Sequence, residues 1–382
     1  MKKKIFTAIG LMTGTSMDGV DLSIIKSDGN TEFTCILDEY FKFDIELREI
    51  LINLRNKLLI PDDLQKYSKE IIDIERRFTL FNCKIIEQVI KKNSLKIDLI
   101  GFHGQTIFHD SEKKITKQLG NGKLLSQITK NIVISNFREK DLNNGGQGAP
   151  LTPIFHKLLS FLLAKNYKVS FPLSIINIGG ITNITQILKN SKSIEKNLKA
   201  YDIGPGNCLI DEWVRKNSKK NFDENGKIAE AGKVNDLILN QALDNFEIKK
   251  FDKSLDVKDF DISFVKGLSL VDGCATLTKF TADLITKGIE YVNDLNNNFY
   301  QKNLICGGGR KNTFLIKTIN KNLTKKKIKL EDIDIYKYDG DFIESQAFGY
   351  LSIRTFLELP IYFPETTRCK SPTIGGIVNK NF

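Results

Sequence analysis

The sequence has few residues that could bind a structural metal or form disulfides. Its 382 residues include only six cysteines and three histidines. None of the cysteines forms a CxxC pair. Structural zinc sites need clusters of these residues at close spacing, and disulfide frameworks are typical of much smaller chains. The cysteine content therefore favours a reduced, cytoplasmic protein.

Long hydrophobic runs are also lacking. No apolar stretch approaches the roughly 20 residues that span a membrane. The basic start Met1–Lys4 and the apolar residues 5–12 resemble a secretory leader. However, the apolar part is short and leads into a polar turn without a clear cleavage site. We expect neither a cleaved leader nor a membrane partner.

A basic stripe of the kind that binds nucleic acid is missing as well. The net charge is +11, but the lysines are spread along the chain and their longest run is 325–327. Such scattered charge favours a solvated surface that attracts small anions, so we expect no nucleic-acid partner. The length and a hydrophobic content of 41% suit two globular domains.

The most informative segment present is Gly10–Asp21, which reads GLMTGTSMDGVD between two apolar runs. The pattern predicts a strand, a polar glycine turn and a second strand. Such a turn can offer backbone N–H groups and hydroxyls to a phosphate chain, and Asp18 or Asp21 can hold a metal directly or through water. Val20 stands where a P-loop has lysine, so this is no Walker motif. An ordinary tight hairpin remains the alternative.

A similar strand–glycine–hairpin pattern occurs again at 173–188, around Gly179 and Gly180. Helical periodicity alternates with strand patterns along the rest of the chain. The expected helices are 61–93, 207–216, 262–292 and 341–359, and further strands are expected at 97–102, 131–137 and 303–306. The alternation predicts an α/β fold, and the repeated hairpin indicates an internal duplication.

Several polar segments follow predicted strands. They are HGQT at 103–106, REKD at 138–141 with the glycine-rich loop 145–151, YDIGPGN at 201–207 and GGGRKN at 307–312. Glycines there permit close approach of a ligand. A carboxylate such as Asp202 can accept a proton from water or a hydroxyl. The alternatives are helix caps, a turn aspartate bonded to its own backbone, and solvated helix residues.

Together these segments closely resemble the anhydro-N-acetylmuramic acid kinases, which belong to the actin-like and hexokinase-like ATPases. The resemblance runs through almost the full chain. It implies two actin-like, ribonuclease H-like domains with a nucleotide and sugar cleft between them. The expected domain I is 1–134 plus 347–382, and domain II is 135–346. The resemblance also implies ATP and Mg²⁺ as cofactors, a small-molecule sugar as substrate, and a homodimer.

The resemblance also implies roles for individual residues. Asp202 would be the general base. Residues that would bind the nucleotide are Gly14, Thr15, Ser16, Met17, Asp18, Gly19, Val20, Asp21, Asn177, Gly179, Gly180, Asn183, Gly307, Gly308 and Gly309. Thr106, Lys140, Asp202 and Glu344 would bind the sugar, and Asp18 and Asp21 would hold Mg²⁺.

The sequence departs from the family pattern in three places. Lys140 stands where arginine is frequent, which exchanges a two-bond carboxylate clamp for a point charge. Residues 364–368 read PETTR where Pro-x-Val-Thr-Gly is expected, and the stretch from Lys253 onward is only partly familiar. The last two differences affect peripheral contacts more than the reaction, and Lys140 could still hold the sugar carboxylate, but less rigidly.

The expected reaction is unusual for a kinase. Asp202 would activate a water that opens the 1,6-anhydro bridge of the sugar, and the freed oxygen at position 6 would take the γ-phosphoryl group of ATP. The alternatives are a plain sugar kinase of the same fold, a non-catalytic nucleotide switch, and an inactive relative.

Overall fold

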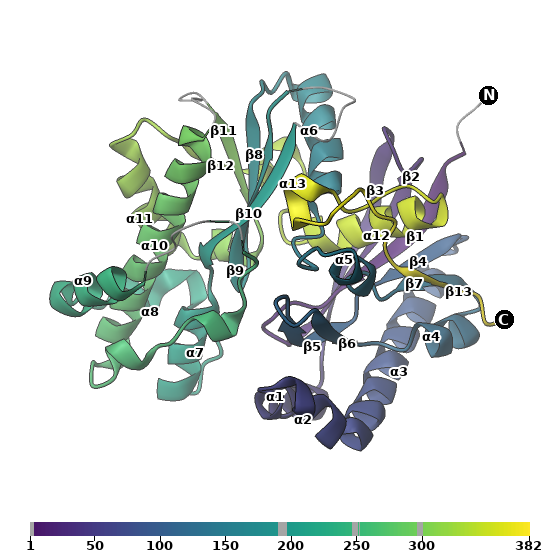
Figure 1. The fold of residues 1–382 in the computed structure, drawn as a ribbon, viewed down its shortest axis with the longest axis horizontal. Coiled ribbons are helices and arrows are strands. Elements are labelled where there is room, and N and C mark those ends of the chain that lie inside the picture. Colours follow the sequence, from purple (N-terminus) through teal and green to yellow (C-terminus); the bar gives the residue numbers. More distant parts are fainter. Residues whose placement is uncertain (1–3, 190–196, 247–250, 252, 296–300) are drawn as a thin grey trace. The chain divides into compact units, whose positions relative to one another are not determined.

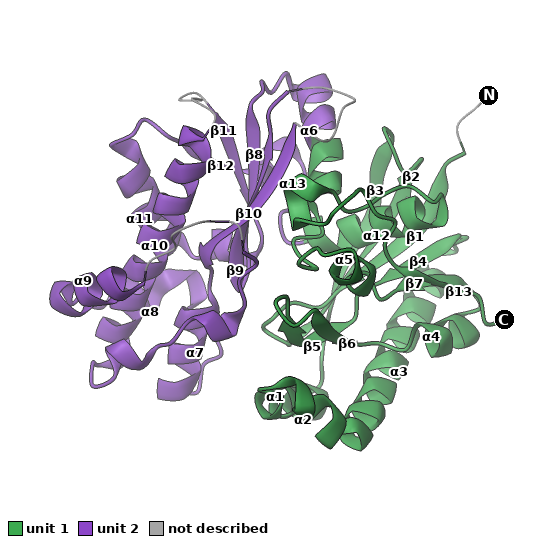
Figure 2. Cartoon of the chain, in the orientation of Figure 1, with its two compact units in different colours: residues 1–159, 342–382 green, residues 160–341 purple. Residues whose placement is uncertain are grey.

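The computed structural model describes residues 4–189, 197–246, 251, 253–295 and 301–382. The chain forms two compact units, residues 1–159 with 342–382 and residues 160–341 (Figure 2). These bounds differ from the predicted domains, because 135–159 and 342–346 belong to unit 1. The division of functional roles between the two domains stays a prediction.

The main sheet of unit 1 has the strand order β13-β7-β4-β1-β2-β3 (Figure 1). The strands β1, β2 and β3 form an antiparallel meander, whereas β4 and β7 run parallel to β1. Their bounds are β1 Phe6–Met12, β2 Gly19–Ser27, β3 Phe33–Lys42, β4 Leu99–Phe102, β7 Ile132–Ser135 and β13 Ile377–Asn379. A separate hairpin contains β5 Gln105–Asp110 and β6 Ile115–Leu119.

The longest helix of unit 1, α3, buries an apolar stripe in the core that it shares with this sheet, with Ile71, Ile74, Phe78 and Ile85 buried, whereas α2 has no buried residue. The helices of unit 1 are α1 Ile45–Lys57, α2 Pro61–Lys66, α3 Ser68–Asn93, α4 Gly122–Thr129, α5 Glu139–Asn143, α12 Ile343–Phe356 and α13 Pro364–Thr367. Helix α6, Pro153–Tyr167, runs from unit 1 into unit 2.

One expected helix is divided. The single helix predicted over 61–93 is two helices, α2 and α3, separated at Tyr67. Its backbone angles, φ −101° and ψ 19°, are not helical, although its N–H still donates to the carbonyl of Asp63. The apolar periodicity continues across this bend, so the pattern alone did not reveal it.

Unit 2 repeats the topology of unit 1. Its sheet has the order β10-β9-β8-β11-β12, with an antiparallel meander of β8, β9 and β10 and with β11 parallel to both β8 and β12. The strands are β8 Leu173–Ile178, β9 Ile181–Ile187, β10 Leu198–Pro205, β11 Lys302–Cys306 and β12 Leu330–Asp332. The same order of antiparallel and parallel neighbours in both units confirms the predicted α/β class and the internal duplication.

Helices of unit 2 pack against this sheet, with α10 lying on β10 (Figure 1). Their bounds are α7 Cys208–Asn217, η1 Glu224–Gly226, α8 Lys227–Glu230, α9 Asp236–Asn245, η2 Val257–Asp259, η3 Ser263–Val265, α10 Leu270–Asp294, η4 Gly308–Lys311, α11 Thr313–Thr324 and η5 Ile333–Tyr336. Helix α10 begins later than the predicted residue 262, because the Ser269 side chain caps its N-terminus by accepting from the Asp272 N–H.

Among the described residues, no helix is both long enough and apolar enough to cross a membrane.

Candidate active-site residues

In unit 1, three polar segments leave the sheet at the same edge. The parallel strands β1, β4 and β7 end before the glycine turn at Gly14, before His103 and before Arg138. The carboxyl ends of parallel strands are where ligands bind in α/β folds. Contacts join the segments: Gln105 Nε2 donates to the Gly14 carbonyl at 3.3 Å, and Arg138 donates to His103 Nε2.

The two predicted metal ligands lie in the glycine turn after β1 and in the first residues of β2: Asp18 is in the turn and Asp21 is in β2. Ser16 Oγ donates to Asp18 Oδ1 at 2.7 Å, which fixes one carboxylate. Asp21 pairs with Tyr40 across β2 and β3. Burial and the charges of Asp18 and Asp21 together raise the pKa of Tyr40. Both carboxylates therefore act on the same phenol and lie at one end of the hairpin.

Two neutral histidines, His103 and His109, lie close enough to Arg138 to be affected by its charge. His103 Nδ1 lies 2.8 Å from the carbonyl of Gly104, so this nitrogen carries the proton and Nε2 accepts from Arg138. Burial and the Arg138 charge lower the pKa of His103 well below its usual value and that of His109 to about 4. The Arg138 guanidinium also donates to the Gly148 carbonyl at 2.7 Å.

Asp141 holds the glycine-rich loop in place. Its buried carboxylate accepts from the Gly148 N–H at 2.7 Å and from Thr367 Oγ1 at 2.6 Å. A Cβ at Gly146 would lie 2.2 Å from Asp141 Oδ2, so the loop has no room for a side chain there. Burial raises the pKa of Asp141, and these hydrogen bonds oppose that rise. The neighbouring Lys140, on α5, is exposed.

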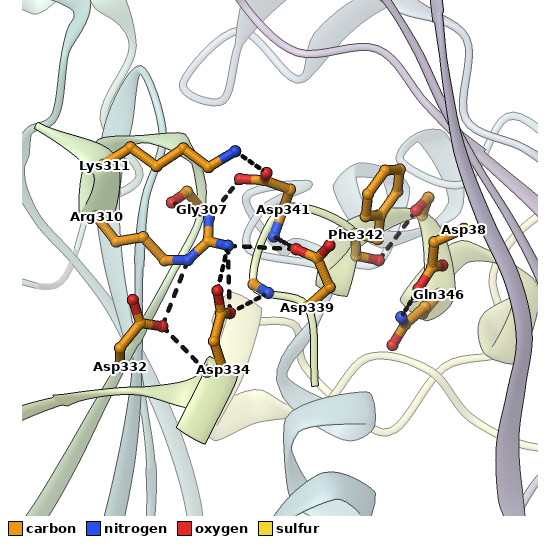
Figure 3. A network of polar contacts seen from close by, with 12 residues as sticks. Asp38, Gly307, Arg310, Lys311, Asp332, Asp334, Asp339, Asp341, Phe342 and Gln346 are labelled. Carbon is orange, nitrogen blue, oxygen red and sulfur yellow. Dashed lines mark hydrogen bonds and ion pairs between the residues drawn. The ribbon is translucent and has the colours of Figure 1, made fainter. Parts of the chain in front are cut away.

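The first turn of α12 carries Glu344 and is tied to β2 and β3. Ser345 Oγ lies 2.6 Å from Ser23 Oγ, and Ser23 donates to Asp38 Oδ1 at 2.5 Å. Gln346 Nε2 donates to the other Asp38 oxygen at 2.9 Å (Figure 3). The helix start that positions Glu344 is therefore fixed to the hairpin that follows the glycine turn.

In unit 2, three predicted site residues form a row across the sheet. Asn177 on β8 pairs with Asn183 on β9, and Asn183 pairs with Asp202 on β10. Directly paired residues of antiparallel strands project from the same face of a sheet. Asp202 was expected to end its strand, but it lies within β10, next to an irregularity in the strand pairing between Asp202 and Gly204.

Three glycine turns of unit 2 contact one another at the end of this row. A Cβ at Gly206 would lie 2.1 Å from the Gly179 carbonyl oxygen. One at Gly307 would lie 2.2 Å from Asn177 Oδ1, and one at Gly309 would lie 2.2 Å from Ile178 Cγ2. Gly307 also has a φ of +82°, a conformation that favours glycine. These glycines are needed for packing, whatever else they do.

The turn at 307–309 is fixed by Arg310, whose side chain is only 3% exposed. The guanidinium forms ion pairs with Asp334 at 2.9 Å, Asp339 at 3.2 Å, Asp332 at 3.4 Å and also Asp341 (Figure 3). The same side chain donates to the Gly307 carbonyl at 3.2 Å. Arg310 therefore connects the glycine turn to the segment 332–341.

Nearly the whole sequence matches one protein family. The family described as anhydro-N-acetylmuramic acid kinase matches residues 6–380. This chain belongs to the anhydro-N-acetylmuramic acid kinase family. Proteins of that name include one from Pelagibacter ubique strain HTCC1062, 50% identical with 100% of both chains covered, and one from Zymomonas mobilis, 37% identical over 97% of this chain and 99% of the relative. The Agrobacterium fabrum protein is 32% identical over 98% and 99%.

Solved structures are less similar. A ROK family glucokinase from Streptomyces griseus, in complex with glucose and AMPPNP, aligns with a TM-score of 0.42 at 10% identity, covering 91% of this chain and 99% of that one. That likeness is too low to support an assignment, so the fold of this family member rests on its two sheets.

Some glycines predicted to contact nucleotide in this kinase-family chain have open surroundings. A Cβ at Gly308 would meet no atom within 4 Å, and the nearest atoms to one at Gly14 or Gly179 would be 3.8 and 3.6 Å away. Packing therefore does not require glycine at these three positions. The buried Asn183 Oδ1, in the row of unit 2, has no hydrogen-bond partner. Open glycine backbone and an unpaired polar atom both suit a polar ligand such as a nucleotide.

The carboxylates Asp18 and Asp21 suit Mg²⁺, which is bound through one or two carboxylates together with substrate phosphates. Within the described residues, no group of three or more histidine, cysteine, aspartate or glutamate side chains could hold a metal ion. A metal at Asp18 and Asp21 would therefore take its remaining ligands from water and phosphate.

The other predicted sugar ligand is Thr106, whose Oγ1 accepts from Gln118 Nε2 at 3.3 Å on the β5–β6 hairpin. Sequence reasoning assigned no role to Arg138, Asp141 or Arg310. The available signal was a charged residue beside a glycine-rich turn, as in 138–148 and 307–310. Sequence reasoning also missed Ser254 and Leu255, whose hydroxyl and N–H donate to Asp202 Oδ2 and which have no such signal.

Proposed function

We propose that this chain opens the 1,6-anhydro ring of 1,6-anhydro-N-acetylmuramic acid with water and phosphorylates the sugar with ATP. The products are N-acetylmuramic acid 6-phosphate and ADP, as in recycling of cell-wall sugars. Membership of the kinase family supports the substrate. The structural observation that carries the proposal is the row Asn177, Asn183 and Asp202, which sets a carboxylate beside the glycine turns of unit 2.

Asp202 is the general base in this proposal. Its carboxylate takes a proton from a water molecule, and the water oxygen forms a bond to the anomeric carbon of the sugar. The bond between that carbon and oxygen 6 breaks, so oxygen 6 leaves with the electron pair. The same oxygen then accepts the phosphoryl group, and this makes the leaving group of one step the nucleophile of the next.

The glycine turns hold the nucleotide. Backbone N–H groups at 14–19, 179–180 and 307–309 bind its polar atoms, and Asp18 and Asp21 hold Mg²⁺, directly or through water. ATP supplies the phosphoryl group and Mg²⁺ neutralises its charge. The residues of this chain contribute positioning, which together with charge stabilisation supplies nearly all of the catalysis in phosphoryl transfer.

The sugar is bound by polar side chains of unit 1. Thr106 donates or accepts a hydrogen bond at a sugar hydroxyl, Glu344 accepts one from a sugar hydroxyl, and Lys140 attracts the lactyl carboxylate. Thr106 is held by Gln118, and Glu344 lies on the helix start anchored through Ser345. Both residues therefore lie on elements with defined positions, as a sugar site requires.

The test follows ADP release from Mg-ATP with and without the anhydro sugar, in water enriched in oxygen-18. We expect sugar-dependent ADP and a sugar phosphate with one heavy oxygen on the anomeric hydroxyl. We expect Asp202→Asn to abolish the sugar-dependent release of ADP and the formation of the labelled sugar phosphate. The matched control is Asp236→Asn, an exposed aspartate in the first turn of α9, which leaves turnover unchanged.

Other outcomes separate the alternatives. Turnover with a different sugar and no heavy oxygen in the product would identify a plain sugar kinase. Nucleotide binding without turnover on any sugar would identify a nucleotide switch or an inactive relative. Either result would remove the assignment of Asp202 as the base that activates water.

We also propose that the protein is a cytoplasmic homodimer. The resemblance to the family supports the dimer, and the cysteines agree with the compartment, since all six lie in the described part of the chain and none forms a disulfide. Light scattering at micromolar concentration gives the mass of two chains if the dimer forms, and fractionation of the producing cells tests the compartment.

A further inference from the structure

We propose that the segment 254–255 is a clamp that positions Asp202 for catalysis, and that Ser254 is a positioning residue of this enzyme. The inference rests on the proposed function, because it concerns the residue to which that function gives the role of base. The proposed clamp gives a role to a segment that lies far from Asp202 in sequence and that matches the sequence pattern of the family only in part.

The clamp consists of two donors on one carboxylate oxygen. Ser254 Oγ donates to Asp202 Oδ2 at 3.1 Å, and the Leu255 N–H donates to the same oxygen at 2.8 Å. Rotation of the carboxylate about its Cβ–Cγ bond would break both hydrogen bonds. The two donors therefore fix the plane of the carboxylate and so the direction in which it can accept a proton.

The clamp is itself held by a capped turn. Immediately after Leu255, the Asp256 N–H donates to Asp259 Oδ2 at 2.7 Å, and the Lys258 N–H donates to Asp256 Oδ1 at 3.1 Å. The Asp259 N–H in turn donates to the Asp256 side chain, and this reciprocal pair between Asp256 and Asp259 forms a capping box around η2. The backbone that presents the Leu255 N–H is therefore not an unconstrained loop.

Two buried aromatic residues anchor the stretch on either side of the clamp. Phe251 is 7% exposed, packs in the cluster that contains Ile203, and has its ring 4.7 Å from that of Tyr291. Phe260 is 8% exposed and stacks on Phe246 with ring centroids 5.2 Å apart. The two anchors lie in different hydrophobic clusters of unit 2, and Ser254 and Leu255 lie between them in sequence.

Asp202 requires such support because of its place in the sheet. The pairing of β10 with β9 is irregular directly after it, and such irregularities change the direction of side chains. Asp202 is 6% exposed, so few water molecules can orient it. Small misplacements of a catalytic group can lower the rate about a hundredfold.

The test compares three variants by steady-state kinetics with Mg-ATP and the anhydro sugar. Ser254→Ala lowers kcat about tenfold or more and changes the KM of either substrate less than about twofold, because the hydroxyl acts on the base and not on the ligands. Ser254→Thr keeps a hydroxyl and restores most of kcat. Ser269→Ala is the control, since it removes a serine that caps α10 of the same unit.

Each other outcome overturns the clamp. Equal kcat for Ser254→Ala and the unchanged protein would show that the hydroxyl is dispensable. If Ser254→Thr does not recover kcat, or if Ser269→Ala loses as much kcat as Ser254→Ala, the effect of the substitution is purely structural. A lowered urea unfolding midpoint of the affected variants would identify such an effect. If Asp202→Asn keeps full turnover, the proposed function fails together with the clamp. If only Asp202→Asn loses turnover, the clamp fails alone.

Discussion

The backbones of Gly10 and Ser345 are in direct contact. A Cβ at Gly10 would lie 1.9 Å from the carbonyl oxygen of Ser345 and 2.4 Å from the amide nitrogen of Gly349. Strand β1 and helix α12 can therefore pack only because residue 10 lacks a side chain. This contact sets the helix start that carries Glu344 beside the strand that leads into the glycine turn.

Gly10→Ala should destabilise unit 1 by about 2 kcal/mol or more, because backbone atoms must move to admit the methyl group. Gly14→Ala is the matched variant, with 3.8 Å to the nearest atom, and should stay within about 0.5 kcal/mol of the unchanged protein. If the turn binds nucleotide, Gly14→Ala should also raise the KM for ATP about tenfold, although it hardly changes stability. Urea unfolding and steady-state kinetics separate the two effects, and equal unfolding free energies for both variants would contradict the packing argument.

Arg310→Met should destabilise unit 2 by about 3 kcal/mol, because four aspartates lose the buried cation that they share and, among the described residues, only Asp341 keeps another one, Lys311. Loss of the bond to the Gly307 carbonyl should also raise the KM for ATP. Lys311→Met is the control, since this lysine is exposed and forms an ion pair with only one of the four aspartates, Asp341. Its loss should lower the free energy of unfolding by less than about 1 kcal/mol. Thermal unfolding with and without ATP measures both effects. Similar losses in the two variants would refute a special role for Arg310.

His156 should make stability fall in acid. Burial lowers its pKa from 6.5 to about 3 in the folded protein. Between these values the unfolded chain binds a proton that the folded chain does not, so stability rises with pH across this window and is constant above it. Because of His156, the free energy of unfolding should be about 1.4 kcal/mol lower at pH 5.5 than at pH 7.5.

His156→Gln removes the titrating group and should reduce the difference in unfolding free energy between pH 5.5 and 7.5 by that amount. Urea titrations at the two pH values provide the measurement. An unchanged difference would mean that the pKa of the imidazole is the same in the folded and the unfolded chain, and so that burial does not lower it.

Lys140→Ala should leave stability unchanged, because the side chain is exposed. If Lys140 attracts the sugar carboxylate, its loss raises the KM for the sugar about tenfold, the effect of one hydrogen bond to a charged group. Lys140→Arg keeps the charge and should restore binding. Lys123→Ala, an exposed lysine on α4, is the control. An unchanged KM in Lys140→Ala would remove this residue from the sugar site.

The local features of the fold could be predicted from the sequence. The strand at 173–178 is mostly apolar, with Ser174 and Asn177 as its polar residues, and is buried throughout, and the glycine turns at 14, 179 and 307 follow strands as expected. Such features depend on residues close in sequence, so periodicity and glycine position suffice. The division at Tyr67 was missed because it does not interrupt the apolar pattern.

The sequence by itself therefore determined the α/β class, the duplicated hairpin and the residue types available for chemistry. Only the tertiary structure decided their neighbours. The register of three strands places Asn177, Asn183 and Asp202 in one row, and Asp141 meets Thr367 across 226 residues. Strand register and contacts between distant segments depend on how the whole chain closes its loops and buries its apolar surface, and no local pattern encodes them.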